Sequence, residues 1–290
     1  MPKLVWLNGT LMPLETATTS VADHAHLYGD GLFEGIRIYH HKVFRLDEHL
    51  ERLYHGCAYL GYEMQIGVVE LRALVLETCA KAEFADGYIR LNVTRGTGLG
   101  LDPKNIDRTP NVMIMVSSLA LYPEEKFLKG LSVMSSSIRV IPADSLDPRV
   151  KCIGRYASNI LAKQLANRAG ADEGLMLNHQ GYIAEGTGNN LFLATGKVLR
   201  TPHPSSGILQ GITRGVVIEL ARANGYEVRE ELLTPYDMRT ASEAFFCGTA
   251  TEIIPMVSLD AVPIGDGKPG PVTQEIMRLF KAETHNGVTF

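Results

Sequence analysis

A lysine in an apolar setting is the feature that most constrains this chain. Lys151 lies among Val150, Cys152 and Ile153 and outside any helical periodicity, so its amine is expected to point into a partly apolar place. A lysine in such a place is easily discharged and can act as a nucleophile. Most lysines are instead surface residues with a buried stem, and this alternative stays open for Lys151 considered alone.

The residues after Lys151 add groups that could serve it. Tyr156 follows shortly, and a helical run is predicted over residues 158–169. Residues 181–190 read Gly-Tyr-Ile-Ala-Glu-Gly-Thr-Gly-Asn-Asn, which places Glu185 in a glycine-rich turn, where a glutamate is otherwise usually a surface residue. Residues 211–214 read Gly-Ile-Thr-Arg and open a predicted helix, whose free backbone N–H groups and dipole favour a phosphate. Thr213 could instead be only a cap residue.

In their order and spacing, the motifs at residues 151–156, 181–192 and 211–214 resemble the class IV (fold type IV) pyridoxal-phosphate-dependent aminotransferases. The resemblance extends from Trp6 to Asp260 and is closest to the branched-chain amino acid aminotransferases. It implies a two-domain α/β (α+β) fold, with a small N-terminal domain of sheet and helices and a larger C-terminal domain. The cofactor, pyridoxal 5'-phosphate, would bind at the domain interface.

Local patterns predict the elements and the domain boundaries. An Asn8-Gly9 turn predicts a hairpin over residues 3–11, and His40-His41 predicts a second one. Apolar residues at helical spacing predict two helices within residues 47–79, and residues 131–140 are strand-like. The polar, proline-containing residues 122–129 form the predicted linker between a domain at 1–121 and one at 130–290.

Residues 88–94 alternate as a strand, so Tyr88, Arg90 and Asn92 share one face and Ile89, Leu91 and Val93 share the other. An arginine on such a face either is exposed to solvent or points into a cleft.

The resemblance assigns cofactor roles by position. Lys151 would form the Schiff base with the cofactor and later act as the base that moves a proton at the substrate's α-carbon. Glu185 would keep the pyridine nitrogen protonated. The remaining cofactor ligands would be residues that contact the phosphate, the ring oxygen or the ring face: Arg45, Ile212, Thr213 and Thr249 for the phosphate, Tyr156 for the ring oxygen, and Leu209 on the ring.

The resemblance also assigns the substrate pocket. Residues of the small domain would select the side chain: Phe33, Gly35, Tyr88 and Arg90. The backbone N–H groups of Thr249 and Ala250 would hold the α-carboxylate. Tyr28 and Leu99 would come from the neighbouring subunit of a homodimer, with the register of the loop near Leu99 left open.

The implied reaction is exchange of an amino group between a branched-chain L-amino acid and 2-oxoglutarate by a ping-pong mechanism. Three alternative activities occur on the same fold. D-amino-acid aminotransferases typically carry an Arg-x-His carboxylate trap where this chain has Gly100-Leu101-Asp102, and (R)-selective amine transaminases generally lack the Tyr-x-Arg strand. Aminodeoxychorismate lyase stays open without a positive feature. A non-catalytic binding protein on the same fold is disfavoured because the chain retains Lys151, Glu185 and the phosphate donors together.

Composition excludes other classes. A net charge of -4 without a basic stripe gives no support for binding to nucleic acid or to anionic membranes. The four cysteines are scattered without paired spacing, which argues against a disulfide framework and a zinc site and fits a reducing cytoplasm. The N-terminus shows no secretory pattern, and no apolar run is long enough to cross a bilayer. The histidines near Tyr28 stand too far from other ligand types to predict a metal site.

Overall fold

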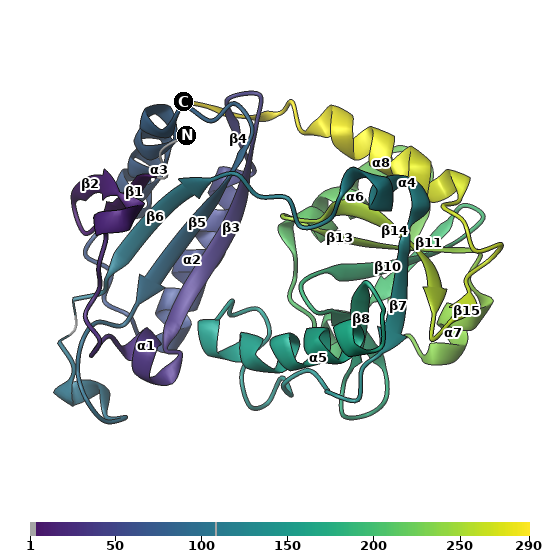
Figure 1. Ribbon diagram of the computed structural model, residues 1–290, viewed down its shortest axis with the longest axis horizontal. Helices are drawn as coiled ribbons and strands as arrows, with labels where there is room; N and C mark the ends of the chain where they lie inside the picture. The colour runs from purple at the N-terminus through teal and green to yellow at the C-terminus, as the bar shows by residue number, and fades with distance from the viewer. Residues whose placement is uncertain (1–3, 108) are drawn as a thin grey trace. The chain divides into compact units, whose positions relative to one another are not determined.

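The computed structural model describes residues 4–107 and 109–290. It forms two compact units of mixed helix and sheet, which confirms the predicted fold class (Figure 1). The first unit comprises the described residues of Met1–Leu119, together with Val150–Tyr156 and Thr284–Phe290. The second comprises Ala120–Arg149 and Ala157–Glu283. This division differs from the contiguous domains predicted at residues 1–121 and 130–290. The segment with Lys151 and the C-terminal strand both belong to the first unit.

The first unit is built on a seven-stranded sheet with the order β16-β4-β3-β5-β6-β1-β2. All of its neighbouring strands are antiparallel. The strands are β1 (Leu4–Leu7), β2 (Thr10–Pro13), β3 (Gly31–Tyr39), β4 (Lys42–Phe44), β5 (Gly87–Thr94), β6 (Val112–Ser117) and β16 (Gly287–Thr289). The helices are η1 (Leu14–Thr16), α1 (His24–Tyr28), α2 (Leu46–Leu60), α3 (Val68–Ala82), η2 (Pro103–Asn105) and η3 (Ile153–Arg155).

The two faces of this sheet differ, as the alternation in β5 predicts. Ile89, Leu91 and Val93 are fully buried, and α2 and α3 pack along this side of the sheet (Figure 1). Tyr88 and Arg90 lie on the opposite face, which α2 and α3 do not cover. The apolar positions therefore fix which strand residues remain available for chemistry.

Both predicted hairpins are present. Asn8 and Gly9 connect β1 to β2 with φ values of 47° and 94°, and His40 and His41 connect β3 to β4 with φ values of 51° and 58°. Positive φ at both central residues is the geometry of the turns that match the twist of a two-residue hairpin. The predicted start of the first hairpin, Lys3, lies outside the described residues.

The second unit is built on a nine-stranded sheet with the order β12-β11-β10-β13-β14-β7-β8-β9, and β15 pairs with β14. Its strands are β7 (Leu131–Ser135), β8 (Glu173–Leu177), β9 (Ile183–Gly186), β10 (Asn190–Thr195), β11 (Val198–Pro202), β12 (Glu227–Glu231), β13 (Glu243–Gly248), β14 (Glu252–Leu259) and β15 (Val262–Pro263). Its helices are α4 (Glu124–Lys129), α5 (Tyr156–Arg168, with its first residue in the first unit), η4 (Pro204–Ser206), α6 (Ile212–Ala223), α7 (Pro235–Thr240) and α8 (Pro271–Glu283).

Two expectations need correction here. The strand expected over residues 131–140 ends at Ser135, and the chain leaves regular pairing after it. The segment expected to be a linker, residues 122–129, instead contains α4, which packs against β14.

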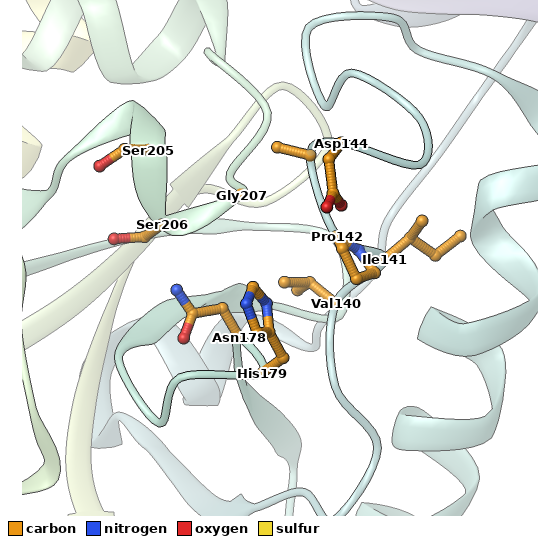
Figure 2. A pocket seen from close by; sticks show the side chains of 10 residues that line it. Val140, Ile141, Pro142, Asp144, Asn178, His179, Ser205, Ser206 and Gly207 are labelled. Atoms are coloured by element: carbon orange, nitrogen blue, oxygen red, sulfur yellow. The ribbon is translucent and has the colours of Figure 1, made fainter.

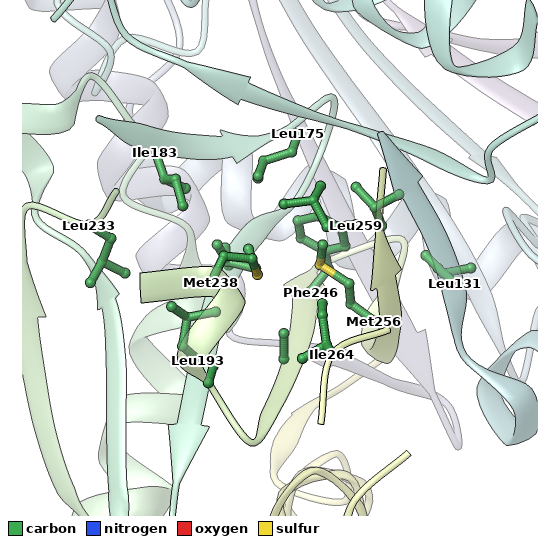
Figure 3. Close-up of a cluster of buried hydrophobic side chains, with 14 of the residues drawn as sticks. Leu131, Leu175, Ile183, Leu193, Leu233, Met238, Phe246, Met256, Leu259 and Ile264 are labelled. Carbon is green, nitrogen blue, oxygen red and sulfur yellow. The ribbon is translucent and has the colours of Figure 1, made fainter. Parts of the chain in front are cut away.

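A buried apolar cluster holds the strands of the second sheet together (Figure 3). Leu175 on β8, Ile183 on β9 and Phe246 on β13 are all fully buried within it. Because β9 and β10 are anchored in this way, the turn between them begins and ends at fixed positions. That turn follows Gly186, the residue after Glu185. Within residues 4–107 and 109–290, every helix is too short or too polar to cross a bilayer.

Candidate active site

The segment around Lys151 is fixed along the edge of β3. Its carbonyl accepts a hydrogen bond from the Phe33 amide at 3.1 Å, and Cys152 forms a bridge with Leu32. Just beyond, the Gly154 amide donates to the Gly29 carbonyl at 3.0 Å. A Cβ atom on Gly29 would lie 2.7 Å from the Gly154 Cα, so this close approach requires glycine.

The Lys151 amine is held among aromatic groups. Its Nζ donates a hydrogen bond to the Tyr156 hydroxyl at 2.6 Å. The same atom lies 4.6 Å from the ring centroid of Phe33 and 5.1 Å from that of Tyr156. The partly apolar setting that the sequence predicts for Lys151 is therefore present, and one hydroxyl orients its amine.

The face of β3 and β5 that α2 and α3 do not cover continues from Phe33 to Arg90. The Arg90 guanidinium lies over the Phe33 ring, with its Cζ 3.5 Å from the ring centroid. The Tyr88 hydroxyl occupies the space above Gly35, where a Cβ atom would come within 2.1 Å of it. Glycine at position 35 thus makes room for the Tyr88 hydroxyl on the face that also carries Arg90.

Arg90 is a partly buried cation with neutral partners. Burial lowers its pKa, and the electrostatic interaction with neighbouring Tyr88 opposes that effect only in part. Its Nε donates to the Asn92 Oδ1 at 2.8 Å. Across the described ranges, no carboxylate forms an ion pair with Arg90. A desolvated guanidinium with only neutral partners is suited to receive an anion.

Glu34 forms a buried ionic network on the opposite, helix-covered face of β3. Its carboxylate accepts hydrogen bonds from Arg52 Nε and His49 Nδ1, each at 2.7 Å. Burial opposes ionisation of Glu34, but the charge and hydrogen bonds of Arg52 outweigh it and lower the pKa to about 2. No role was predicted for these residues from sequence, although Glu34 alternates with Phe33 and Gly35 and therefore had to point toward the helices.

Arg45, Tyr28 and Leu99 also belong to the first unit. Arg45 adopts a left-handed conformation, φ 52°, between β4 and α2, and its Nη1 pairs with Glu48 at 3.0 Å. The Tyr28 hydroxyl accepts a hydrogen bond from the Gly100 amide at 3.1 Å, which ties α1 to the loop containing Leu99. Tyr28 is 44% exposed and Leu99 74% exposed.

In the second unit, Glu185 is a buried carboxylate at the end of β9. It accepts hydrogen bonds from the Leu209 amide at 3.0 Å and from the Asn190 Nδ2 at 3.2 Å. Asn190 also donates to the Leu209 carbonyl at 2.9 Å. No role was predicted for Asn190 from sequence, but it links Glu185 to the segment of Leu209. A Cβ atom at Gly211 would lie 2.2 Å from the Asn190 Oδ1, so this link also depends on glycine.

The motif at residues 211–214 opens α6, as predicted. Gly211 is the N-cap residue of α6, and as a glycine it has no side chain that could cap the helix. The amides at the start of the helix, including those of Ile212 and Thr213, therefore lack intrahelical partners. Thr213 lies inside the helix and is not its cap residue, which removes that alternative.

A second buried carboxylate, Glu173, connects the turns of this unit. It accepts hydrogen bonds from the Thr187 hydroxyl at 2.6 Å and from the Asn189 Nδ2 at 3.3 Å. Asn189 Oδ1 in turn accepts a hydrogen bond from the Thr251 hydroxyl. Glu173 thus ties the turn after Glu185 to the residues that follow Thr249 and Ala250. This role could not be predicted from sequence, because Glu173 and its partners on the turn at residues 187–189 are distant along the chain.

Replacing Glu173 with glutamine should lower the free energy of unfolding by about 1.5–3 kcal/mol, the value of hydrogen bonds to a charged group. One amide oxygen cannot accept from the donors that now surround both carboxylate oxygens, which include Gly174 N at 2.7 Å and the Tyr122 hydroxyl at 2.7 Å. Urea denaturation would measure the loss, with exposed Glu77→Gln as the matched control. Equal midpoints for the two variants would contradict it.

The second unit also contains a cavity of about 200 Å³, lined in part by Val140, Asp144 and His179. The hydroxyls of Ser205 and Ser206 are directed away from Asp144 and His179 (Figure 2). None of the predicted site residues lines this cavity. In the described residues, no three His, Cys, Asp or Glu side chains are grouped to hold a metal ion.

The family is established by comparison with known proteins. The model of the family "Amino-transferase class IV" matches residues 31–259, which includes Lys151, Glu185 and Thr249. The chain belongs to the class IV aminotransferases. The resemblance noted in the sequence is thereby confirmed.

Relatives of this class IV aminotransferase match it over nearly its whole length. A Methanocaldococcus jannaschii protein is 42% identical over 278 residues, which are 96% of this chain and 95% of that protein. The structure of the Escherichia coli branched-chain amino acid aminotransferase gives a TM-score of 0.93 at 33% identity, covering 97% of this chain and 94% of that one. The pyridoxal-phosphate form of the Thermobaculum terrenum branched-chain enzyme gives 0.89 at 31% identity, covering 98% and 94%.

Proposed function

We propose that this class IV aminotransferase exchanges an amino group between branched-chain L-amino acids and 2-oxoglutarate, using pyridoxal 5'-phosphate in two successive half-reactions. The observation that carries this proposal is the Lys151 amine, bonded to the Tyr156 hydroxyl at 2.6 Å beside the Phe33 ring. The similarity to branched-chain aminotransferases along the whole chain supports the substrate class.

The donor set fits pyridoxal phosphate. Lys151 offers an amine for covalent attachment, and Glu185 offers a buried carboxylate for a pyridinium nitrogen. The N-terminus of α6 with Thr213 offers donors for a phosphate, to which we add Arg45, Ile212 and Thr249. Tyr156 would serve the ring oxygen and Leu209 the ring face. When bound, the cofactor supplies the electron sink for loss of a proton from the amino acid.

The protein's part in the reaction is binding and proton transfer. Lys151 would move the proton at the substrate's α-carbon, with its amine oriented by the Tyr156 hydroxyl. The backbone amides of Thr249 and Ala250 would hold the α-carboxylate. Phe33, Gly35, Tyr88 and Arg90 would form the wall that meets the side chain, because they share one face of the first sheet.

Glu185→Gln should slow both half-reactions by about 1.5–3 kcal/mol in the transition state, because the pyridine nitrogen would lose a charged hydrogen-bond partner. Cofactor content should stay near that of the unmodified protein, since the phosphate donors are untouched. Stopped-flow rates with L-leucine and L-glutamate would measure the loss, with exposed Glu227→Gln as the control. Unchanged turnover at full cofactor content would remove Glu185 from this role.

We also propose that the enzyme is at least a homodimer and works in the cytoplasm. Tyr28, Leu99 and Leu101 are 44%, 74% and 76% exposed in the single chain, which supports a second copy covering them. The four cysteines are free and buried, which suits a reducing compartment.

A donor panel against 2-oxoglutarate tests the proposed function. L-leucine, L-isoleucine and L-valine should be converted, and D-leucine and (R)-1-phenylethylamine should react far more slowly. Preference for either of the last two would replace the proposal with a D-amino-acid or (R)-amine transaminase. If L-leucine leaves the visible absorption of the protein unchanged, the chain is a binding protein.

A further inference from the structure

We propose that Asn92 is a specificity-determining positioning residue, which holds Arg90 so that its charge stays available to a substrate's side-chain carboxylate. This inference rests on the proposed function, because it concerns the glutamate and 2-oxoglutarate half-reaction. Asn92 is half-buried on β5, directly opposite Phe33 on β3. Its place on the Tyr88 and Arg90 face follows from strand alternation, but its contact with Arg90 does not.

The Arg90 guanidinium is constrained on two sides. Its Nε donates to the Asn92 Oδ1 at 2.8 Å, and one of its flat faces lies over the Phe33 ring at 3.5 Å. A guanidinium has five N–H donors in a rigid fork, and a carboxylate can meet it along the Nε edge or across the two Nη atoms. Asn92 occupies the Nε edge. The Nη end is left for Tyr88 and for an incoming carboxylate.

Asn92 holds the Nε edge of the Arg90 guanidinium without cancelling its positive charge. A second buried arginine in the same unit shows the contrast, because Arg52 donates from Nε and Nη2 to the two oxygens of Glu34, each at 2.7 Å. There a carboxylate occupies the same edge and satisfies the cation within the fold. At Arg90 a neutral amide takes that edge, so the positive charge remains to attract a ligand.

The same arrangement suits an apolar substrate. When a leucine side chain fills the pocket, Arg90 keeps its contacts with Asn92, Tyr88 and Phe33. The buried Nε–H group therefore still has a hydrogen-bond acceptor. When glutamate enters, only the Nη end needs to change partners. Asn92 therefore lets one wall accept both kinds of side chain.

Two substitutions separate the charge effect from the hydrogen bond. Asn92→Asp places a carboxylate on the Nε edge, as Glu34 does for Arg52, and it repels the substrate's side-chain carboxylate. Asn92→Leu removes the acceptor at similar volume and frees the guanidinium to move. Steady-state kcat and KM would be measured for L-glutamate, L-glutamine and L-leucine with the holoenzyme. Exposed Asn167→Asp serves as a charge-matched control.

We expect Asn92→Asp to lower the glutamate-to-leucine ratio of kcat/KM by about 30-fold or more, mostly through KM, since an opposed charge acts on binding. Glutamine, which is neutral, should follow leucine. Asn92→Leu should lower the ratio by about 5- to 10-fold, as for loss of one ordinary hydrogen bond, because the Arg90 charge itself is retained. The Asn167→Asp control should leave the ratio unchanged.

Equal losses for glutamate, glutamine and leucine in both variants would overturn the proposal and leave Asn92 a purely structural residue. If Asn92→Asp does not fold, an unchanged ratio in Asn92→Leu would overturn it as well. The unmodified enzyme distinguishes this failure from failure of the proposed function: if it converts leucine but not glutamate, the proposed amino-group acceptor is wrong whatever the variants do.

Discussion

Lys151→Ala should abolish transamination and remove the visible absorption of the bound cofactor, while the protein stays folded. The amine that would hold the cofactor and move the substrate's proton is the one bonded to Tyr156, and alanine has no group to replace it. Loss of covalent attachment and of general base catalysis together should cost at least about 10⁴-fold in rate. The fold should persist, because the contacts of this segment with Phe33 and Leu32 are made by the backbone.

Three measurements would check this outcome: absorption spectra of the purified protein, circular dichroism, and turnover of L-leucine with 2-oxoglutarate. Exposed Lys129→Ala, whose partner is Glu125 on the same helix, is the control and should behave like the unmodified enzyme. A yellow, active Lys151→Ala protein would contradict the whole assignment, because the cofactor would then be attached elsewhere.

Local pattern accounts for the parts of the site that the sequence could predict. Alternation in residues 88–94 places Tyr88, Arg90 and Asn92 on one face, and the Arg90 Nε donates to the Asn92 Oδ1 there. The apolar neighbours of Lys151 predict a sheltered amine, which lies beside the Phe33 ring. Both inferences depend on neighbours along the chain, where periodicity and side-chain type carry the information.

The parts that the sequence could not predict depend on distant pairing. Strand β16 at the C-terminus pairs with β4 in the first unit, so a division into contiguous domains could not find it. Glu173 contacts Thr187 and Asn189 on one turn and Tyr122 on a distant segment. Before the fold is known, each of these polar residues is indistinguishable from a solvated one.

The strand-like residues 136–140 show the limit of propensity. They include the β-branched residues Ile138 and Val140, but the ladder ends at Ser135. Beyond it the amides of Ser136 and Val140 still donate to carbonyls of β8, at 2.8 and 3.1 Å, without regular pairing between them. Tertiary contacts, here with one neighbouring strand, override the local preference.

Arg90→Ala should impair the glutamate and 2-oxoglutarate half-reactions by about 2–5 kcal/mol, and the leucine half-reaction much less. One pocket must take an apolar branched side chain and a side-chain carboxylate, so its walls must be apolar while one cation is available. Arg90 meets both demands, because its face packs on Phe33 and its partners Tyr88 and Asn92 are neutral. Truncation removes the cation but leaves the aromatic wall that a leucine side chain would contact.

Single-turnover rates for each half-reaction would test this, and the predicted range corresponds to a loss of about 30-fold to several thousand-fold for glutamate. Arg90→Lys is the informative companion variant, because it keeps a charge but cannot donate along two edges at once. We expect it to retain part of the glutamate activity. Equal losses for leucine and glutamate in Arg90→Ala would instead make Arg90 a structural group or a ligand of the α-carboxylate, since that group is common to both substrates.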